Sequence, residues 1–318
     1  MKRLIPALLM AATFGAAAQA YPTKPIRIVA SYPPGGTNDF VARSVGQKLS
    51  EMLGQQVLVD NRSGAGGNIG ADSVAKAAPD GYTLFMAAGA HALAPSLYKK
   101  LSYDLVRDFA HISIASQAAF VLVVNPSIPA NNAKDLIQYI KGQPGGVNYA
   151  VTGIGVPTHL AGEMFKSLAG IQMTPVAYKG DSPALVDLLG GQVGVSFASI
   201  APALPHIKSQ KLRPLAVSTA QRSVILPGIP TVAEATGFAD FDVRTWFGLM
   251  APAGTPPEIL RTLEAAMVKI TAMPDIKEKF AAQGMDALSS TSGEFSAFVK
   301  DQIQKYAHMV KTANVQPE

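Results

Sequence analysis

The chain has 318 residues, of which 48% are hydrophobic and 15% are charged. This composition is typical of a globular protein of about two domains, and it excludes collagen-like, coiled-coil and disordered chains. The absence of cysteine excludes disulfide scaffolds, thiolate metal sites and cysteine nucleophiles. The formal net charge is only +5 and no cluster of Lys and Arg occurs, so we expect no nucleic-acid partner.

The first twenty residues have the pattern of a secretory signal peptide. Lys2 and Arg3 precede a nearly uncharged apolar run over residues 4–18, and a small-x-small cleavage site follows at residues 18–20. The run is shorter than the roughly 20 residues needed to span a bilayer, which argues against an uncleaved anchor. We therefore expect residues 1–20 to be removed before Tyr21, and the mature chain to act outside the cytoplasm.

Short β-branched runs alternate with amphipathic segments from Tyr21 onward, which predicts an α/β fold with largely parallel sheets. The first set of predicted strands covers residues 26–30, 56–59, 82–87 and 111–115. The second set covers residues 120–124, 147–151, 174–178, 194–198 and 213–218. A turn-rich stretch then leads to a strand over residues 246–251 and to three closing helices. Two sets of strands predict two sheets, and hence two lobes.

Two of the closing helices have clear start signals. Thr255 is the predicted N-cap of one, and residues 291–294 form a capping box at the start of the other. The apolar stripes of these helices need a surface to cover, so we expect the chain to return to the first sheet. The first lobe would then be discontinuous, formed by residues 21–119 and 228–318, and residues 120–227 would form the second lobe.

Two glycine-bordered loops, one in each predicted lobe, are the candidate ligand sites. Residues 32–38 follow the first strand and precede a helix with Thr37 or Asn38 as its predicted N-cap, and residues 152–158 stand in the same place in the second set. Glycines ahead of a helix leave backbone N–H groups uncovered at the positive end of the helix dipole, which favours anion binding. The carboxylate of Asp39, in the first turn, opposes this interpretation for the first loop. Because ligands bind beyond the carboxyl ends of strands in open α/β sheets, we expect both loops to face one cleft.

Two further loops are interpreted as structural. Residues 61–70 resemble a dinucleotide-binding fingerprint, but the spacing is G-x-G-x-x-x-G and no acidic residue ends a following strand, so we expect a tight strand-to-helix turn. Residues 179–183 begin another helix, which Asp181 or Ser182 can cap. A carboxylate in that position would repel an anionic ligand, so we expect this loop to be a wall of the cleft.

No catalytic constellation stands out in the sequence. His159 and Glu163 are four residues apart on a predicted helix but lack a third ligand, so we interpret them as an exposed helix pair and expect no metal. Ser73 and Ser96 each begin an S-x-x-K tetrad without the partner motifs of the enzymes that use it. We therefore expect a protein that is not an enzyme and has no cofactor. An extracytoplasmic hydrolase acting through one of these serines is the alternative.

Motifs along the whole mature chain point to one family. They are Pro33-Pro34-Gly35-Gly36-Thr37, Pro79-Asp80-Gly81-Tyr82-Thr83-Leu84, Tyr178-Lys179-Gly180, Asp187-Leu188-Leu189-Gly190-Gly191 and Trp246-Phe247-Gly248-Leu249. In these motifs the chain resembles the Bug family, the extracytoplasmic solute receptors of tripartite tricarboxylate transporters. The resemblance covers essentially all of the chain after residue 20.

The resemblance implies a two-lobed periplasmic binding protein that captures a small organic carboxylate in a cleft between the lobes and delivers it to the membrane subunits of a transporter. We expect the receptor itself to be a monomer in the periplasm. A sensory co-receptor without a transport role fits the same resemblance. The ligand-binding residues expected here are Tyr32, Gly35, Gly36, Thr37, Asn38, Gly89, Ala90, His91, Thr152, Gly153, Gly155, Val156, Thr158 and Ser199.

Two positions depart from the family pattern. Relatives often have an aspartate after the position of Phe197, where this chain has Ala198 and then Ser199, which puts amino-acid ligands in doubt. Asp181 replaces a more usual small neutral residue, which disfavours extra negative charge on that side of the ligand. Backbone donors recognise a carboxylate but not the body attached to it, so the sequence leaves the ligand open. Tyr32, Phe197 and Trp246 are candidates to line that body, and Trp246 is equally a candidate for the core.

Overall fold

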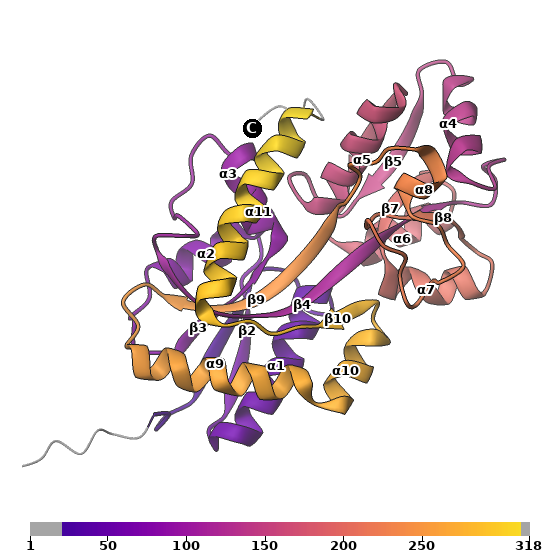
Figure 1. Cartoon of the computed structure of the whole chain (residues 1–318). Coiled ribbons are helices and arrows are strands. Elements are labelled where there is room, and N and C mark those ends of the chain that lie inside the picture. Colours follow the sequence, from indigo (N-terminus) through magenta and orange to yellow (C-terminus); the bar gives the residue numbers. More distant parts are fainter. Residues whose placement is uncertain (1–20, 313–318) are drawn as a thin grey trace, which may run out of the picture.

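Two long strands join two α/β lobes in the computed structural model, which describes residues 21–312 (Figure 1). The expected signal peptide therefore lies outside the described residues. Strand β4 (Phe109–Val124) pairs with β9 (Arg244–Pro252) in antiparallel fashion through the first lobe and then continues into the second. The chain thus crosses between the lobes at two places, within β4 and at the start of β9, where Ala119 pairs with Arg244.

Three parallel strands, in the order β2-β1-β3, form the first lobe's sheet, and β9 and β4 extend it with antiparallel pairing. Its elements are β1 (Ile26–Ala30), α1 (Thr37–Leu53), β2 (Val57–Asn61), α2 (Asn68–Ala75), β3 (Thr83–Ala88), α3 (Gly89–Leu97), α9 (Pro257–Ala272), α10 (Pro274–Ala281), β10 (Met285–Ala287) and α11 (Ser292–Thr312). Helices α1, α9 and α10 pack on one face, and α2, α3 and α11 pack on the other. The three closing helices therefore return to the first sheet, as their apolar stripes predict.

The second lobe repeats this plan. Three parallel strands, in the order β6-β5-β7, are extended by the end of β4 and by β8 with antiparallel pairing. Its elements are α4 (Ala133–Lys141), β5 (Val147–Val151), α5 (Pro157–Ala169), β6 (Met173–Ala177), α6 (Asp181–Leu189), β7 (Val195–Ser199), α7 (Ile200–Lys208), β8 (Arg213–Val217) and α8 (Val232–Thr236). Helices α4 and α5 cover one face, and α6 and α7 cover the other.

The first crossing between the lobes lies inside one strand. The sequence predicts separate strands over residues 111–115 and 120–124, but β4 is continuous through both. No Gly or Pro occurs between residues 109 and 124, so nothing in the chain interrupts the extended backbone. Strand β4 pairs with β9 up to Ala119 and with β7 from Phe120. The sequence does not predict the short strand β10, which pairs with residues 116–118 of β4.

The second crossing lies at the start of β9 instead of near residue 228. The segment that follows β8 packs on the second lobe, because the ring of Phe238 lies 6.2 Å from that of Phe165 and the ring of Phe241 stacks on Phe197 at 5.7 Å between centroids. Helix α8 also packs against α4. These aromatic contacts hold the chain against the second lobe until it enters β9.

Side-chain caps are found at some of the predicted positions and not at others. Thr291 and Glu294 form the predicted capping box, with Thr291 N–H donating to Glu294 Oε2 at 2.8 Å. The N-cap of α1 is Gly36, and Thr37 is the first helical residue. The N-cap of α9 is Pro256, because the Thr255 hydroxyl donates to the Pro252 carbonyl at 2.8 Å instead of capping the helix.

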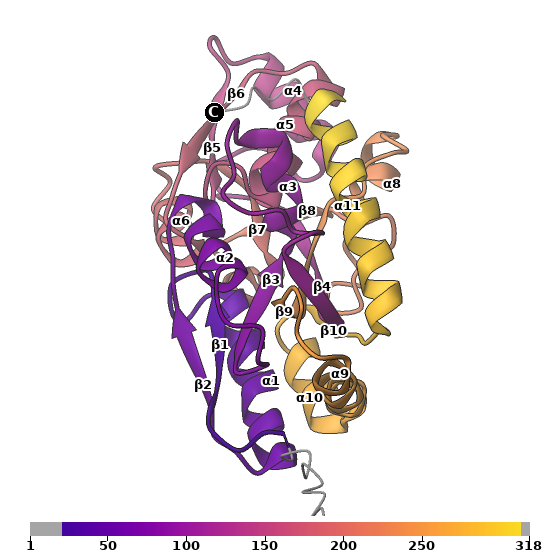
Figure 2. The same cartoon turned by 90° about the vertical axis from the view of Figure 1, so that its left-hand side faces the viewer.

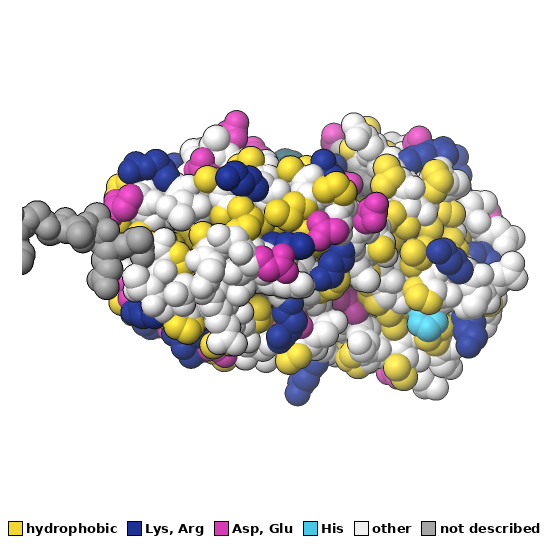
Figure 3. Space-filling view, turned by 90° about the horizontal axis from the view of Figure 1, so that it is seen from below, with side chains coloured by type: hydrophobic (Ala, Val, Ile, Leu, Met, Phe, Trp, Pro, Cys, Tyr) yellow, Lys and Arg dark blue, Asp and Glu magenta, His cyan; other side chains and the backbone are white. Residues whose placement is uncertain are grey.

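Helix α11 runs along the first lobe, and its far end lies beside α5 of the second lobe (Figure 2). The face in Figure 3 carries acidic and basic side chains interspersed over both lobes, with no large area of one sign. Within residues 21–312, none of the helices combines the length and the apolar character that crossing a membrane requires.

Candidate ligand-binding cavity

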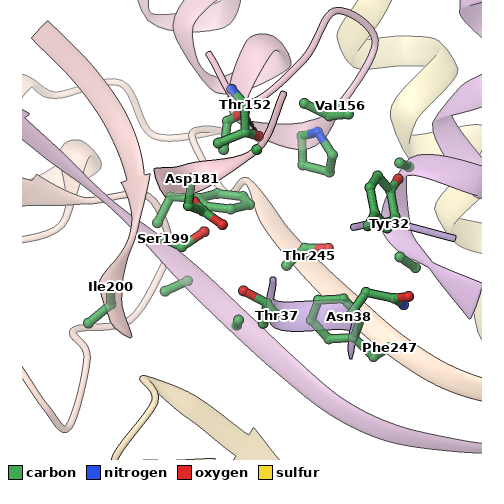
Figure 4. A pocket seen from close by; sticks show the side chains of 18 of the residues that line it. Tyr32, Thr37, Asn38, Thr152, Val156, Asp181, Ser199, Ile200, Thr245 and Phe247 are labelled. Atoms are coloured by element: carbon green, nitrogen blue, oxygen red, sulfur yellow. Dashed lines mark hydrogen bonds between the residues drawn. The ribbon is translucent and has the colours of Figure 1, made fainter. Parts of the chain in front are cut away.

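A cavity lies between the two lobes, and small-molecule sites are often found at such an interface between domains. The first lobe contributes Tyr32, Thr37, Asn38, Ala88, Ala90, Thr245, Phe247 and Gln283 to its lining. The second lobe contributes Thr152, Val156, Pro157, Thr158, Gly180, Asp181, Ser199 and Ile200. The crossing segment of β4 runs between them (Figure 4). Its residues Ala118, Ala119 and Phe120 complete the lining.

Five helices begin at this cavity. The residues that line it include the N-cap or the first two helical residues of α1, α3, α5, α6 and α7. The first N–H groups of a helix have no partner within the helix, and the helix dipole makes that end positive. Among the described residues, no Lys, Arg or His side chain lines the cavity. Its positive field therefore comes from backbone, which is the arrangement suited to a small anion.

The first loop uses some of its own donors internally. Gly35 N–H donates to Asp39 Oδ2 at 3.0 Å, and Ser31 N–H donates to Asn38 Oδ1 at 3.1 Å. Burial would raise the pKa of Asp39, but hydrogen bonds from Arg43, from the Gly35 N–H and from a nearby asparagine outweigh it, so the pKa is lowered. Asp39 therefore stays ionised and holds the loop. The expected glycine donor is occupied, and the N–H groups of Thr37 and Asn38 at the helix start are the open ones.

The second loop repeats this device with different side chains. Gly155 N–H donates to His159 Nδ1 at 3.3 Å, and Thr152 N–H donates to Thr158 Oγ1 at 3.3 Å. In both lobes the residue four positions after a glycine, on the following helix, engages the glycine N–H. Because α5 has a proline at its first position, Thr158 carries the first N–H of that helix.

Tyr32 forms a wall of the cavity and is held by the glycine-rich loop beneath it. Its hydroxyl donates to the Gly66 carbonyl at 2.9 Å. The loop runs from the end of β2 through a 3₁₀ turn at Ala65–Gly67 into α2, so it is the strand-to-helix turn that its spacing predicts. A Cβ at Gly67 would lie 2.8 Å from His91 Nε2 and 3.1 Å from the Tyr32 hydroxyl, which explains glycine there.

The structure brings eight of the fourteen expected residues to the cavity lining: Tyr32, Thr37, Asn38, Ala90, Thr152, Val156, Thr158 and Ser199. Gly35 and Gly36 line a wider hollow at its mouth. Gly89, His91, Gly153 and Gly155 line neither. His91 is 0% exposed, and a Cβ at Gly89 would meet the Tyr306 hydroxyl at 2.9 Å. These two residues therefore lie behind the cavity wall.

Strand β9 supplies lining residues that the sequence analysis missed. Side chains alternate along a strand, so Thr245 and Phe247 face the cavity while Trp246 points to the opposite side. Trp246 packs edge-on against Phe295 at 5.6 Å between ring centroids. Phe197 is likewise fully buried. Of the three aromatic residues expected to line the ligand body, Tyr32 lines the cavity, whereas Phe197 and Trp246 are core residues. The alternation of side chains along β9 was the signal for the neighbours of Trp246.

Within residues 21–312, Asp181 is the one charged residue that lines the cavity. It is the first residue of α6, whose N-cap is Gly180, and its carboxylate lies against Ser199 (Figure 4). Burial raises the pKa of the Asp181 carboxyl above its usual value, and the adjacent Ser199 opposes part of that effect. The residue expected to cap a helix in the cleft wall thus presents an acceptor within the cavity.

The other candidate chemistry does not assemble. Glu163 is buried, accepts from the Tyr149 hydroxyl at 2.7 Å and pairs with Lys166, so it is not part of an exposed pair with His159. Within residues 21–312, no group of three His, Asp or Glu side chains could hold a metal ion. The Ser73 hydroxyl donates to the Gly70 carbonyl at 2.7 Å, so it is not directed at the basic residue of its tetrad.

Two α/β lobes around a cavity with helix N-termini on both sides define a solute-binding protein. The family model described as the tripartite tricarboxylate transporter family receptor matches residues 41–315. The chain therefore belongs to this receptor family. It is 37% identical over 318 residues to the protein BugT of Bordetella pertussis, covering 98% of this chain and 97% of that protein.

Two solved structures are similar over nearly the whole chain. An R. palustris protein solved with adipate has a TM-score of 0.89 and 33% identity, with 94% of this chain and 100% of that chain covered. MatC from Rhodopseudomonas palustris, solved with bound malate, has a TM-score of 0.83 and 28% identity, with 91% of this chain and 100% of that chain covered.

Proposed function

We propose that this protein is a periplasmic receptor, and not an enzyme, that captures a small organic carboxylate between its lobes and delivers it to the membrane subunits of a tripartite tricarboxylate transporter. The observation that carries the proposal is the convergence of five helix N-termini, from both lobes, on a cavity that no basic side chain of the described residues lines. Adipate and malate, bound in the two similar structures, are both small carboxylates.

The backbone groups are strong enough for this task. A hydrogen bond to a charged group is worth about 1.5 to 3 kcal/mol net, and a helix terminus up to ~2 kcal/mol. Three or four such donors, less the cost of ordering and desolvation, leave the ~8 kcal/mol of a micromolar complex. Because these donors read only the carboxylate, the apolar and hydroxyl-bearing residues around them select the body of the ligand.

Delivery follows from the position of the cavity. An acid held by both lobes favours the conformation in which the lobes are closest, and a membrane partner that binds this conformation better distinguishes the loaded receptor from the empty one. We assign residues 21–119, together with the chain from β9 onward, to the first lobe, and the segment between to the second. We further propose that the receptor is a monomer released by cleavage before Tyr21.

The test is calorimetry with a panel of linear, hydroxylated and aromatic carboxylic acids, combined with one backbone edit. Replacing Thr37 by proline removes the first open N–H of α1 yet suits the first position of a helix, and the preceding Gly36 is already extended (φ −81°, ψ 170°) as a residue before proline should be. We expect Thr37→Pro to weaken binding by about tenfold or more. Thr37→Val, which keeps the N–H, is the matched control.

If the folded wild-type protein bound none of the acids, the proposed function would be wrong. If the wild type and Thr37→Pro bound an acid equally tightly, the protein would still be a carboxylate receptor, but the start of α1 would not be part of its binding site.

A further inference from the structure

We propose that Asp181 makes this receptor selective for acids that carry a hydrogen-bond donor, a hydroxyl or an ammonium, on the carbon beside a carboxylate. The inference rests on the proposed function and deepens it, because it names the class of carboxylate. It assigns Asp181 as a specificity-determining residue whose carboxylate accepts a hydrogen bond from that donor.

The position of Asp181 is the first reason. It lines both the inner cavity and the wider hollow at its mouth, so it lies where the two meet. Figure 4 shows its carboxylate between Ser199 and the open space of the cavity, on the side that faces Thr37 of the other lobe. A ligand carboxylate at the start of α1 would therefore have Asp181 across the cavity from it.

The neighbour of Asp181 is the second reason. Ser199 lies against its carboxylate (Figure 4), and this neighbour favours the ionised form of Asp181. This corner of the cavity consequently offers acceptors, while the helix starts around it offer donors. A ligand with a carboxylate and an adjacent donor matches both kinds of group, whereas an unsubstituted acid leaves the acceptors unmatched.

The charge of the surroundings is the third reason. No basic side chain lines the cavity within residues 21–312, and the nearest along the chain, Lys179, is exposed and lines the outer hollow. The positive ends of the helices thus compensate the charge of the Asp181 carboxylate only in part, and burial raises the pKa of Asp181. A ligand hydroxyl or ammonium would supply the missing donor, whereas a second ligand carboxylate beside Asp181 would add like charge.

The experiment compares acids that differ at one atom. Succinate, malate and aspartate share four carbons, and they carry hydrogen, hydroxyl and ammonium on the second carbon. Glutarate with 2-hydroxyglutarate and glutamate, and adipate with 2-hydroxyadipate and 2-aminoadipate, repeat the comparison at five and six carbons. Among acids with the number of carbons that binds tightest, we expect the dissociation constant of wild-type protein for a donor-bearing acid to be lower than that for the unsubstituted acid by about tenfold or more.

Two substitutions separate the roles of charge and acceptor. In Asp181→Ala the preference should vanish, and the unsubstituted acid should bind as tightly as its substituted partners or tighter. In Asp181→Asn an acceptor oxygen stays but the charge is lost, so the hydroxy acid should keep most of its affinity while the amino acid loses about tenfold or more. Circular dichroism and the melting temperature confirm that each variant is folded.

Asp187→Asn is the matched control. Asp187 is on the same helix as Asp181, and its replacement by Asn removes the same charge. Asp187 accepts a hydrogen bond from the Tyr178 hydroxyl at 2.8 Å, however, and does not line the cavity. The wild-type preference should persist in this variant. The inference is overturned if wild-type protein prefers unsubstituted acids, if Asp181→Ala keeps the wild-type ratios, or if none of the nine acids binds. The first two outcomes leave a carboxylate receptor intact, and only failure of the wider acid panel removes the proposed function as well.

Discussion

His91 illustrates how a polar residue beside the cavity serves the structure instead of the ligand. Its Nδ1 accepts the N–H of Ala88 at 2.9 Å, which leaves Nε2–H facing the Gly67 carbonyl at 3.4 Å. These contacts join the first turn of α3 to the glycine-rich loop that holds Tyr32. The ligand contact expected of His91 can therefore be made only by its neighbours, of which Ala88 and Ala90 reach the cavity.

The burial of His91 predicts an acid-sensitive stability. Desolvation lowers the pKa of His91 to about 4, against roughly 6.5 in the unfolded chain. Between these values the unfolded state holds a proton that the native state lacks, so stability falls as pH falls, by about 1.4 kcal/mol per pH unit for one such group. Burial lowers the pKa of His111 to about 4 as well, so the two slopes add.

Urea unfolding at about pH 7 and about pH 5 measures this slope. His91→Gln keeps a side chain that can bond the Ala88 N–H, as a glutamine at this helix position does, but it cannot be protonated. We expect its slope to be roughly half that of the wild type. Equal slopes in the two proteins would show that His91 is not the titrating group.

At the scale of single residues, the sequence predicts the position of the site better than it predicts which N–H groups there are free to bind a ligand. Both loops are where the glycine pattern places them, but the N–H of Gly35 is taken by Asp39 and that of Gly155 by His159. Such contacts depend on how each helix turns relative to its loop. Likewise, Asp181 and Ser199 are two departures from the family pattern that lie far apart in the sequence. That they lie against each other follows only from the packing of α6 beside β7.

Among the elements, helix starts matter most for the site and strand continuity matters most for the fold. The sequence predicts the parallel strands and the returning helices well because apolar periodicity reports burial directly. It predicts β4 as two strands, since the small and polar residues at the crossing give no periodic signal. Pairing with β9 on one side and β7 on the other determines that segment, and pairing is a tertiary property.

The docking of α11 on β9 gives a prediction at this scale. A Cβ on Gly248 would lie 2.1 Å from the ring of Phe295, which is fully buried. Gly248→Ala should therefore lower the free energy of unfolding by about 1 to 3 kcal/mol. Gly293→Ala, in the first turn of the same helix with nothing within 4 Å of the new Cβ, should instead raise it by roughly 0.5 to 1 kcal/mol. Urea unfolding distinguishes these outcomes, and equal effects of the two changes would contradict this packing.

The whole molecule is closed on one side and open on the other. On the side of α3, α5 and α11 the two lobes share one apolar cluster, and α11 touches both. On the opposite side the loops before α1 and α6 and the first turn of α7 line the mouth of the cavity. Entry of a ligand and approach of the lobes therefore belong to the side where the helix starts face each other.

The most direct test is a crystal structure of the complex with the acid that binds tightest. We predict a carboxylate with oxygens about 2.7 to 3.2 Å from N–H groups at helix starts of both lobes, Thr37 or Asn38 on one side and Thr158 or the start of α6 or α7 on the other. An acid that contacts one lobe alone, or whose carboxylate is held by a Lys or Arg side chain outside the cavity, would contradict this account.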